Sequence, residues 1–242
     1  SSHHVDLWEE LAALGVVDRQ SARWAANVEA LRSEVALPPA PVPTDLRATL
    51  RPYQLEGYHW LARLWDARVG GILADDMGLG KTLQVIAVLA RAHEREELGG
   101  AGSEAAARGR GPVLVVVPTS VIGTWLGEFE AFAPHLHVTA VTDTGRKRGT
   151  AVVDAIKDAQ VVVTSYAVLR LDDEAFREVE WGGVVLDEAQ FVKNRQAKTH
   201  VAVRRLGSPF TVAVTGTPLE NSLMDLWSLL SLTAPGLYPR PD

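Results

Sequence analysis

The chain has 242 residues, of which 47% are hydrophobic, and its 24 Lys and Arg against 30 Asp and Glu give a net charge of −6. This composition predicts a folded domain with a large core and excludes global disorder. The sequence has no Cys, which excludes disulfides, Cys-ligated zinc and a thiol nucleophile. Its apolar runs are far shorter than the roughly 20 residues that span a bilayer, so we expect a cytoplasmic protein without a membrane partner. The mild acidity argues against coating nucleic acid by bulk charge.

The first 45 residues are expected to form an appendage or the tail of a truncated upstream domain. Ser1–His4 are typical of an expression-tag remnant, and the apolar spacing over 5–36 favours helices. The segment Leu37–Pro43 contains four prolines, which cannot continue a helix or enter a central strand. We interpret it as an extended linker and place the main domain at 46–242.

From residue 46 onward the pattern predicts an α/β domain. Short β-branched runs alternate with amphipathic helical stretches, and runs that are apolar at nearly every position indicate strands buried on both faces. We therefore predict a parallel sheet with crossover helices on both of its faces. The polar, Gly-rich stretch Ala92–Gly111 is expected to be a mobile surface loop. Strands are expected over Gly71–Ala74, Val113–Val117, Val138–Val141, Val161–Thr164, Val184–Leu186 and Thr211–Val214.

The segment GILADDMGLGKT, Gly71–Thr82, has the order of a phosphate-binding loop: a strand, a glycine-containing turn and a helix that begins near Lys81. Gly78 and Gly80 let backbone N–H groups point at an anion, and the helix N-terminus adds a positive dipole end. Lys81 is expected to reach the β- and γ-phosphates, and the Thr82 hydroxyl to ligate Mg²⁺. The residues predicted to contact the nucleotide here are Asp76, Met77, Gly78, Leu79, Gly80, Lys81 and Thr82.

Two acidic residues follow the apolar run of VVLDEAQ, Val184–Gln190. A carboxylate at the exposed end of a buried strand can hold Mg²⁺ through its water shell, and this is the role predicted for Asp187. Glu188 is then positioned to orient and activate an attacking water. Such a pair alone is often a solvated loop, but together with Lys81 and Thr82 it predicts a site for a nucleoside triphosphate and Mg²⁺, with Lys81, Asp187 and Glu188 as catalytic residues.

The segment LRPYQLEGYHWL, Leu50–Leu61, suggests which nucleobase the site binds. A Gln side chain offers one acceptor and two donors, which match the N6/N7 edge of adenine. Gln54 is therefore a candidate for reading adenine, with Tyr53 or Arg51 packing nearby. The alternative is that Gln54, at a helix start, is a capping or surface residue.

The segments RPYQLEG, DDMGLGKT, LVVVPTSVIGTWLGEFEAF, VVVTSY, LDEAQFVKN and TGTPLENSLMDLWSLL resemble, in this order, the motifs of SWI/SNF-type helicase-like ATPases of helicase superfamily two. The resemblance covers roughly 46–238, and DEAQ in place of DEAH or DEGH looks like the bacterial branch. It implies a RecA-like lobe that uses ATP and Mg²⁺ to translocate along double-stranded DNA and remodel protein–DNA complexes. A nucleoid-associated location would follow.

The resemblance also assigns residues to coupling and to DNA. Thr215, Gly216 and Thr217, with Gln190, match the motifs that link the nucleotide site to DNA, although Thr-Gly-Thr-Pro is equally good as a plain turn. Two hydroxyl-bearing segments resemble those that lie on the DNA backbone, and helix caps after strands are the alternative reading of both. These segments are Pro118, Thr119 and Ser120, and Thr164, Ser165 and Tyr166. Trp125 and Phe129 are interpreted as core residues.

Members of this family have two lobes, and the second supplies arginine fingers worth about 10³–10⁵ in turnover. We therefore expect this chain, tested alone, to bind nucleotide with little hydrolysis and weak affinity for DNA. A second hypothesis is a nucleotide-responsive module that docks on a protein partner such as transcription or repair machinery. An RNA helicase of the same superfamily is disfavoured, because RNA-acting relatives usually lack the RPYQ, GLGKT and TGTPLEN motifs.

Overall fold

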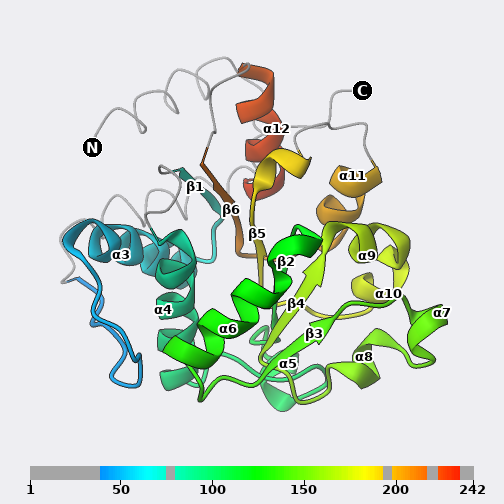
Figure 1. Cartoon of the computed structure of the whole chain (residues 1–242), viewed down its shortest axis with the longest axis horizontal. Coiled ribbons are helices and arrows are strands. Elements are labelled where there is room, and N and C mark those ends of the chain that lie inside the picture. Colours follow the sequence, from blue (N-terminus) through cyan, green and yellow to red (C-terminus); the bar gives the residue numbers. More distant parts are fainter. Residues whose placement is uncertain (1–38, 75–79, 193–197, 217–222, 235–242) are drawn as a thin grey trace.

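The computed structural model describes residues 39–74, 80–192, 198–216 and 223–234. Within these residues the fold is a parallel sheet of six strands in the order β1-β6-β5-β2-β4-β3 (Figure 1). Every neighbouring pair of strands is parallel, as the apolar runs predict. The strands are β1 (Gly71–Ala74), β2 (Val113–Val117), β3 (Val138–Val141), β4 (Val161–Ser165), β5 (Gly183–Leu186) and β6 (Thr211–Thr215).

The four inner strands are buried at every position, whereas the edge strands β1 and β3 are partly exposed. Alternate residues of β2 point to opposite faces, so Val113 and Val115 join one hydrophobic cluster while Leu114 and Val116 join the other. A sheet that is apolar on both faces requires helices on both. The predicted α/β class with a doubly covered parallel sheet is confirmed.

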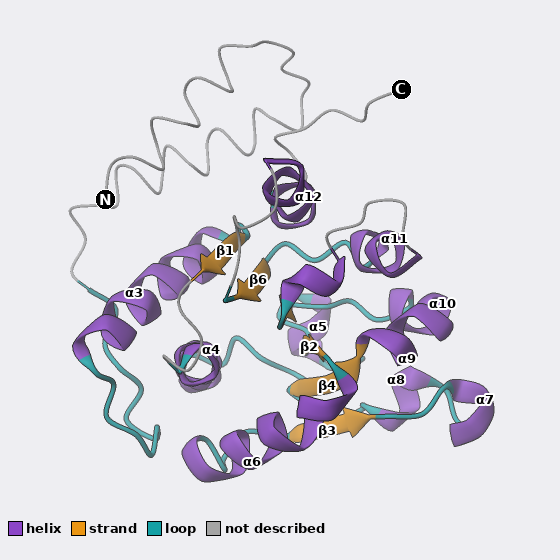
Figure 2. Ribbon diagram, turned by 45° about the horizontal axis from the view of Figure 1, so that its top comes forward, coloured by secondary structure: helices purple, strands orange, loops and turns teal. Residues whose placement is uncertain are grey.

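One face of the sheet is covered by α3 (Pro52–Ala67), α4 (Lys81–Glu94) and α6 (Ile122–Phe132), whose apolar residues form one cluster. The opposite face is covered by the later helices of the chain, which form the second cluster with the other side of the strands (Figure 2). The short helices η2 (Thr119–Val121) and η3 (Ala189–Val192) follow β2 and the acidic turn after β5. The remaining helices are α5 (Glu104–Ala107), α7 (Gly145–Arg148), α8 (Val152–Ala155), α9 (Tyr166–Leu171), α10 (Asp173–Arg177), α11 (Lys198–Arg205) and α12 (Leu223–Thr233).

The stretch Ala92–Gly111 is not the single surface loop that its composition suggests. Helix α4 continues through Glu94, and Ser103 caps the short helix α5 by accepting a hydrogen bond from the Ala106 N–H at 3.1 Å. Leu98 and Ala101 are buried. These two apolar residues, which stand among polar ones, pack the stretch against the core. They explain why the stretch differs from the predicted surface loop.

Residues 1–38, most of the predicted appendage, lie outside the described residues. The end of the Pro-rich linker is in contact with the domain, since the Pro41 carbonyl accepts a hydrogen bond from Tyr58 on α3. Glu94 on α4 accepts a hydrogen bond from the Thr44 hydroxyl at 2.7 Å, and Leu46 is buried in the core. The boundary at residues 45 and 46 stays a prediction. Over the described ranges, no helix has the length and apolar character needed to cross a membrane.

Candidate nucleotide site

The phosphate-loop motif lies between β1 and α4. Strand β1 ends at Ala74, and α4 begins at Lys81 with Gly80 as its N-cap. Gly80 has φ 71°, a left-handed conformation that glycine adopts without steric cost. The N-terminal end of this 14-residue helix follows the carboxyl end of β1, and the positive end of its dipole favours an anion there. Asp76, Met77, Gly78 and Leu79 lie outside the described residues.

Gln54 lies directly against this loop. Its Oε1 accepts a hydrogen bond from the Arg51 N–H at 2.9 Å, so it caps α3 as the alternative reading proposed. Its other side-chain atom, Nε2, approaches Gly80 so closely that a Cβ there would lie 2.4 Å away. The two readings are therefore compatible: the cap holds the amide at the edge of the phosphate loop. Gln54 is buried, whereas Arg51 is exposed.

Asp187 is held at the carboxyl end of β5 by hydrogen bonds to four residues, one of which runs from its own N–H to the Val116 carbonyl at 2.9 Å. Its Oδ2 accepts a hydrogen bond from Trp125 Nε1 at 2.8 Å, its Oδ1 accepts one from the Glu188 N–H at 2.9 Å, and its carbonyl accepts one from the Tyr166 hydroxyl at 2.7 Å. Burial raises the pKa of Asp187, against the lowering effect of the Trp125 and Glu188 hydrogen bonds and of the Lys81 charge. Lys81, after β1, and Asp187, after β5, follow the carboxyl ends of strands that lie on either side of β6 in one parallel sheet, so both lie at the same edge of the sheet.

The donor set fits Mg²⁺. Each oxygen of Asp187 accepts one hydrogen bond and so keeps a lone pair. Mg²⁺ is usually held by one or two carboxylates together with substrate phosphates and water, and the Thr82 hydroxyl, on the first turn of α4, adds a further oxygen donor. The described residues include no group of three His, Cys, Asp or Glu that could hold a metal.

Glu188 and Thr215 are connected through Gln190. The Gln190 side-chain amide donates a hydrogen bond to Glu188 Oε2, and its Oε1 accepts one from the Thr215 hydroxyl at 3.3 Å. Thr215 is buried at the end of β6, next to β5. Three residues expected to act in catalysis and coupling are therefore joined in one chain of hydrogen bonds. Gly216 follows Thr215 and is half-buried, and Thr217 lies outside the described residues.

The two segments expected on DNA differ in exposure. Thr119 and Ser120 are exposed on η2, directly after β2, and Pro118 is half-buried. The side chains of Thr164, Ser165 and Tyr166 are buried, and each makes a hydrogen bond within the protein. Ser165 caps α9 by accepting from the Val168 N–H at 3.1 Å, which is the capping alternative. Their hydroxyls therefore form hydrogen bonds to backbone groups of the domain itself.

Sequence reasoning missed the role of Trp125. Its ring is in the core as predicted, but its indole N–H donates to the acidic motif. The signal in the sequence was general: a buried indole N–H needs an acceptor, yet the pattern does not tell which one. Glu128, one turn further along α6, was also missed. Burial raises its pKa, and the charge of Asp187 adds to this effect.

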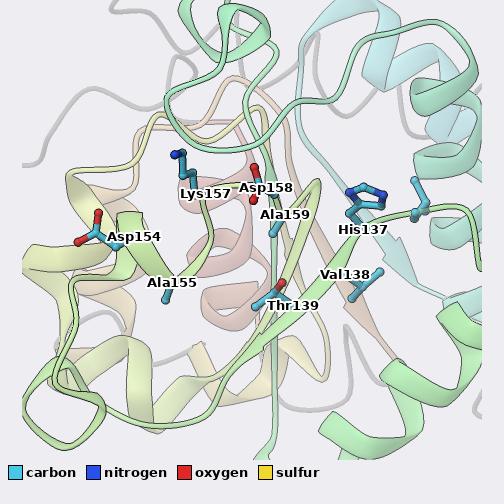
Figure 3. Close-up of a pocket in the computed structure, with 9 residues that line it drawn as sticks. His137, Val138, Thr139, Asp154, Ala155, Lys157, Asp158 and Ala159 are labelled. Carbon is cyan, nitrogen blue, oxygen red and sulfur yellow. The ribbon is translucent and has the colours of Figure 1, made fainter.

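A separate pocket of about 490 Å³ lies at the other end of the sheet (Figure 3). It is lined by the start of β3 and by the segment from α8 to β4, and Asp154, Lys157 and Asp158 stand at its rim. Because the strands are parallel, their amino ends lie opposite the edge that carries Lys81 and Asp187. The described residues that line it include no predicted site residue.

Comparisons with known proteins agree with this geometry. The family model of the SNF2-related domain matches residues 53–241. The putative ATP-dependent helicase/translocase YwqA of Bacillus subtilis is 36% identical over 231 residues, covering 96% of this chain and 24% of that protein. The TATA-binding protein-associated factor mot1 of Aspergillus fumigatus is 40% identical over 195 residues, covering 81% of this chain and 10% of that protein.

The solved structure of the Sulfolobus solfataricus SWI2/SNF2 ATPase core in complex with dsDNA has a TM-score of 0.68 and 41% sequence identity, covering 80% of this chain and 37% of that one. This chain spans about a tenth to a quarter of the curated relatives named above. The RecA-like α/β fold, the start of α4 at the same edge of the sheet as the acidic end of β5, and a family match over most of the sequence lead to one conclusion. The chain belongs to the SNF2-related family of SWI2/SNF2-type helicase-like ATPases.

Proposed function

We propose that this chain is the ATP-binding lobe of a DNA-dependent ATPase and translocase that remodels protein–DNA complexes. The observation that carries the proposal is the placement of Lys81, at the start of α4, and Asp187, at the end of β5, at the carboxyl edge of one parallel sheet. A cationic side chain at a helix N-terminus beside a strand-end carboxylate suits a nucleoside triphosphate with its metal ion. Family membership supports ATP as the nucleotide.

Each residue then has a defined task. Lys81 would neutralise the β- and γ-phosphates, and Gln54 would read the adenine edge from beside the loop. Asp187 and the Thr82 hydroxyl would hold Mg²⁺, which when bound offsets charge on the phosphate oxygens. Glu188 would orient the attacking water and accept its proton, with its carboxylate held by Gln190.

Duplex DNA is the partner that we propose for the exposed hydroxyls of Thr119 and Ser120. Hydroxyl and backbone N–H contacts to phosphate fix the position of DNA but carry no sequence information, which suits a translocase. The named complex of the Sulfolobus solfataricus relative with dsDNA supports this choice. We further propose that the protein is bacterial, cytoplasmic and nucleoid-associated, because it has the motif DEAQ in place of DEAH or DEGH.

A second candidate is a nucleotide-responsive module that docks on a protein of the transcription or repair machinery. The 40% identity to a TATA-binding protein-associated factor favours it, as does the net charge of −6. The salt dependence of binding to duplex DNA distinguishes the two. Phosphate contacts give a steep loss of affinity as salt rises, whereas a protein-docking module would bind DNA weakly at every salt concentration.

The proposal is tested by ATP binding to the whole chain, measured calorimetrically with Mg²⁺. We expect Lys81→Ala to abolish binding and Glu188→Gln to retain it. Lys198, which is exposed at the first position of α11, is the matched control, and Lys198→Ala should bind like the wild type. Failure of the wild-type chain to bind Mg·ATP would overturn the proposal.

Hydrolysis is measured beside binding, with duplex DNA, duplex RNA or no nucleic acid. We propose that the chain tested alone hydrolyses ATP near the background rate, because it spans only part of its relatives' length. DNA-stimulated turnover that Glu188→Gln removes would contradict this proposal for the isolated chain but support the catalytic role of Glu188. Stimulation by RNA instead would contradict the choice of DNA.

A further inference from the structure

Trp125 joins the hydrophobic core to the acidic end of β5. Its side chain is 1% exposed and packs beside Phe129, with ring centroids 5.9 Å apart. The indole N–H leaves this apolar packing and donates to Asp187 Oδ2 at 2.8 Å, across 62 positions of sequence. The hydrogen bond therefore ties α6 to the strand end that carries the proposed magnesium ligand.

Two of the other hydrogen bonds of Asp187 fix its backbone rather than its side chain. Its N–H donates to the Val116 carbonyl at 2.9 Å, and its own carbonyl accepts from the Tyr166 hydroxyl at 2.7 Å. Oδ1 accepts a hydrogen bond from the N–H of the next residue, Glu188, which is a local contact. Trp125 reaches the second carboxylate oxygen from a different element and so restrains the rotation of the carboxylate.

An indole suits this position chemically. It donates one hydrogen bond and accepts none, so it orients a carboxylate without competing for it. It also carries no charge, whereas Lys or Arg at the same distance would reduce the negative charge that a cation needs. Magnesium requires nearly ideal octahedral geometry, and its carboxylate ligand must therefore be held in one orientation.

We propose that Trp125 is a positioning residue for Mg²⁺, which acts by holding Asp187 and does not touch the nucleotide. This inference rests on the proposed ATP site. Residues that hydrogen-bond a metal ligand typically change metal affinity by about 10-fold to 100-fold when they are replaced. The loss should therefore appear in the contribution of Mg²⁺ to nucleotide binding and not in nucleotide binding as such.

The test compares ATP affinity with Mg²⁺ and with EDTA in the wild-type chain and in Trp125→Phe, which keeps an aromatic ring but has no N–H. We expect the ratio of the two affinities to fall about tenfold or more, with the EDTA value unchanged. The matched control is Trp181→Phe. Trp181 is 4% exposed and donates its indole N–H to the Phe176 carbonyl at 2.8 Å, so the variant loses a similar buried hydrogen bond far from the site.

A second measurement needs no substitution. The indole N–H signal of Trp125 in the wild-type chain, followed by ¹H–¹⁵N NMR, should shift when Mg²⁺ is added to the ATP-bound chain, while the Trp181 signal stays in place. An unmoved Trp125 signal, or a Trp125→Phe chain with an unchanged ratio, would overturn this inference alone. A wild-type chain that binds no Mg·ATP would overturn the proposed function and this inference together.

Discussion

The side-chain amide of Gln190 donates a hydrogen bond to the carboxylate of Glu188. Because Gln190 also accepts a hydrogen bond from Thr215, its replacement by Ala should leave the Glu188 carboxylate without this restraint. We expect Gln190→Ala to bind Mg·ATP normally but, in a protein in which this lobe is paired with a second lobe, to hydrolyse ATP roughly tenfold to a hundredfold more slowly, as misplaced catalytic groups do. Single-turnover hydrolysis with excess protein measures this. Gln190→His, which keeps a donor, should retain most of the rate, and equal losses in both variants would contradict the argument.

Glu188 is a non-glycine residue with φ 49°, in the left-handed region that costs roughly 1–2 kcal/mol for residues with a Cβ. We therefore expect Glu188→Gly to be more stable than Glu188→Ala by about 1 kcal/mol, since only the glycine relieves this strain. Urea unfolding of both variants gives the difference in the free energy of unfolding.

The control for this pair is Glu178, which is exposed and has φ −71°. There the order should reverse, with Glu178→Gly less stable than Glu178→Ala, because glycine loses more backbone entropy on folding. If the glycine variant is less stable than the alanine variant at both positions, the left-handed backbone at Glu188 does not lower the free energy of unfolding.

The sheet could be predicted from the sequence because the pattern of apolar residues in each strand depends on which of its faces are buried. A run such as Val113–Val117 is apolar on both faces only where both faces are covered, and all of its residues are buried. The positions of Lys81 and Asp187 follow in the same way, since parallel strands bring both motifs to one edge. These features depend on local patterns, which a single sequence contains.

The contacts between motifs could not be predicted in this way. The Trp125 indole and the Tyr166 hydroxyl reach Asp187 through distances and rotamers that only the folded chain fixes. Thr164 shows the converse. A hydroxyl near the end of an apolar strand resembles a surface group, but this side chain is fully buried and its hydroxyl donates a hydrogen bond to the Val141 carbonyl at 2.7 Å. Exposure of polar residues at strand ends depends on which helix packs over them.

The half-buried ring of His135 lies 5.1 Å from the ring of His93, measured between centroids. Burial lowers the pKa of His135, and the charge of His93 lowers it further, against opposing effects of Asp45 and Glu94. A group whose folded-state pKa is depressed contributes stability above its unfolded pKa, about 6.5 for His, and loses it as the pH falls through the folded value. We expect the melting temperature to fall between about pH 7 and pH 5, and His135→Gln to reduce this dependence. An unchanged pH dependence in the variant would assign the effect to other groups.

Gly80 combines two constraints, and a matched glycine separates them. Its φ is 71°, and a Cβ at this position would lie 2.4 Å from Gln54 Nε2. Gly149 has a similar φ of 78°, but a Cβ there would meet no atom within 4 Å, so Gly149→Ala carries the backbone strain alone, about 1–2 kcal/mol. We expect Gly80→Ala to lose more stability than Gly149→Ala and to weaken ATP binding, because Gln54 must move away from the loop. Urea unfolding and calorimetric ATP titration of both variants measure the two effects. Equal stability losses with unchanged ATP affinity would show that the position of Gln54 against the loop matters neither to the fold nor to the nucleotide.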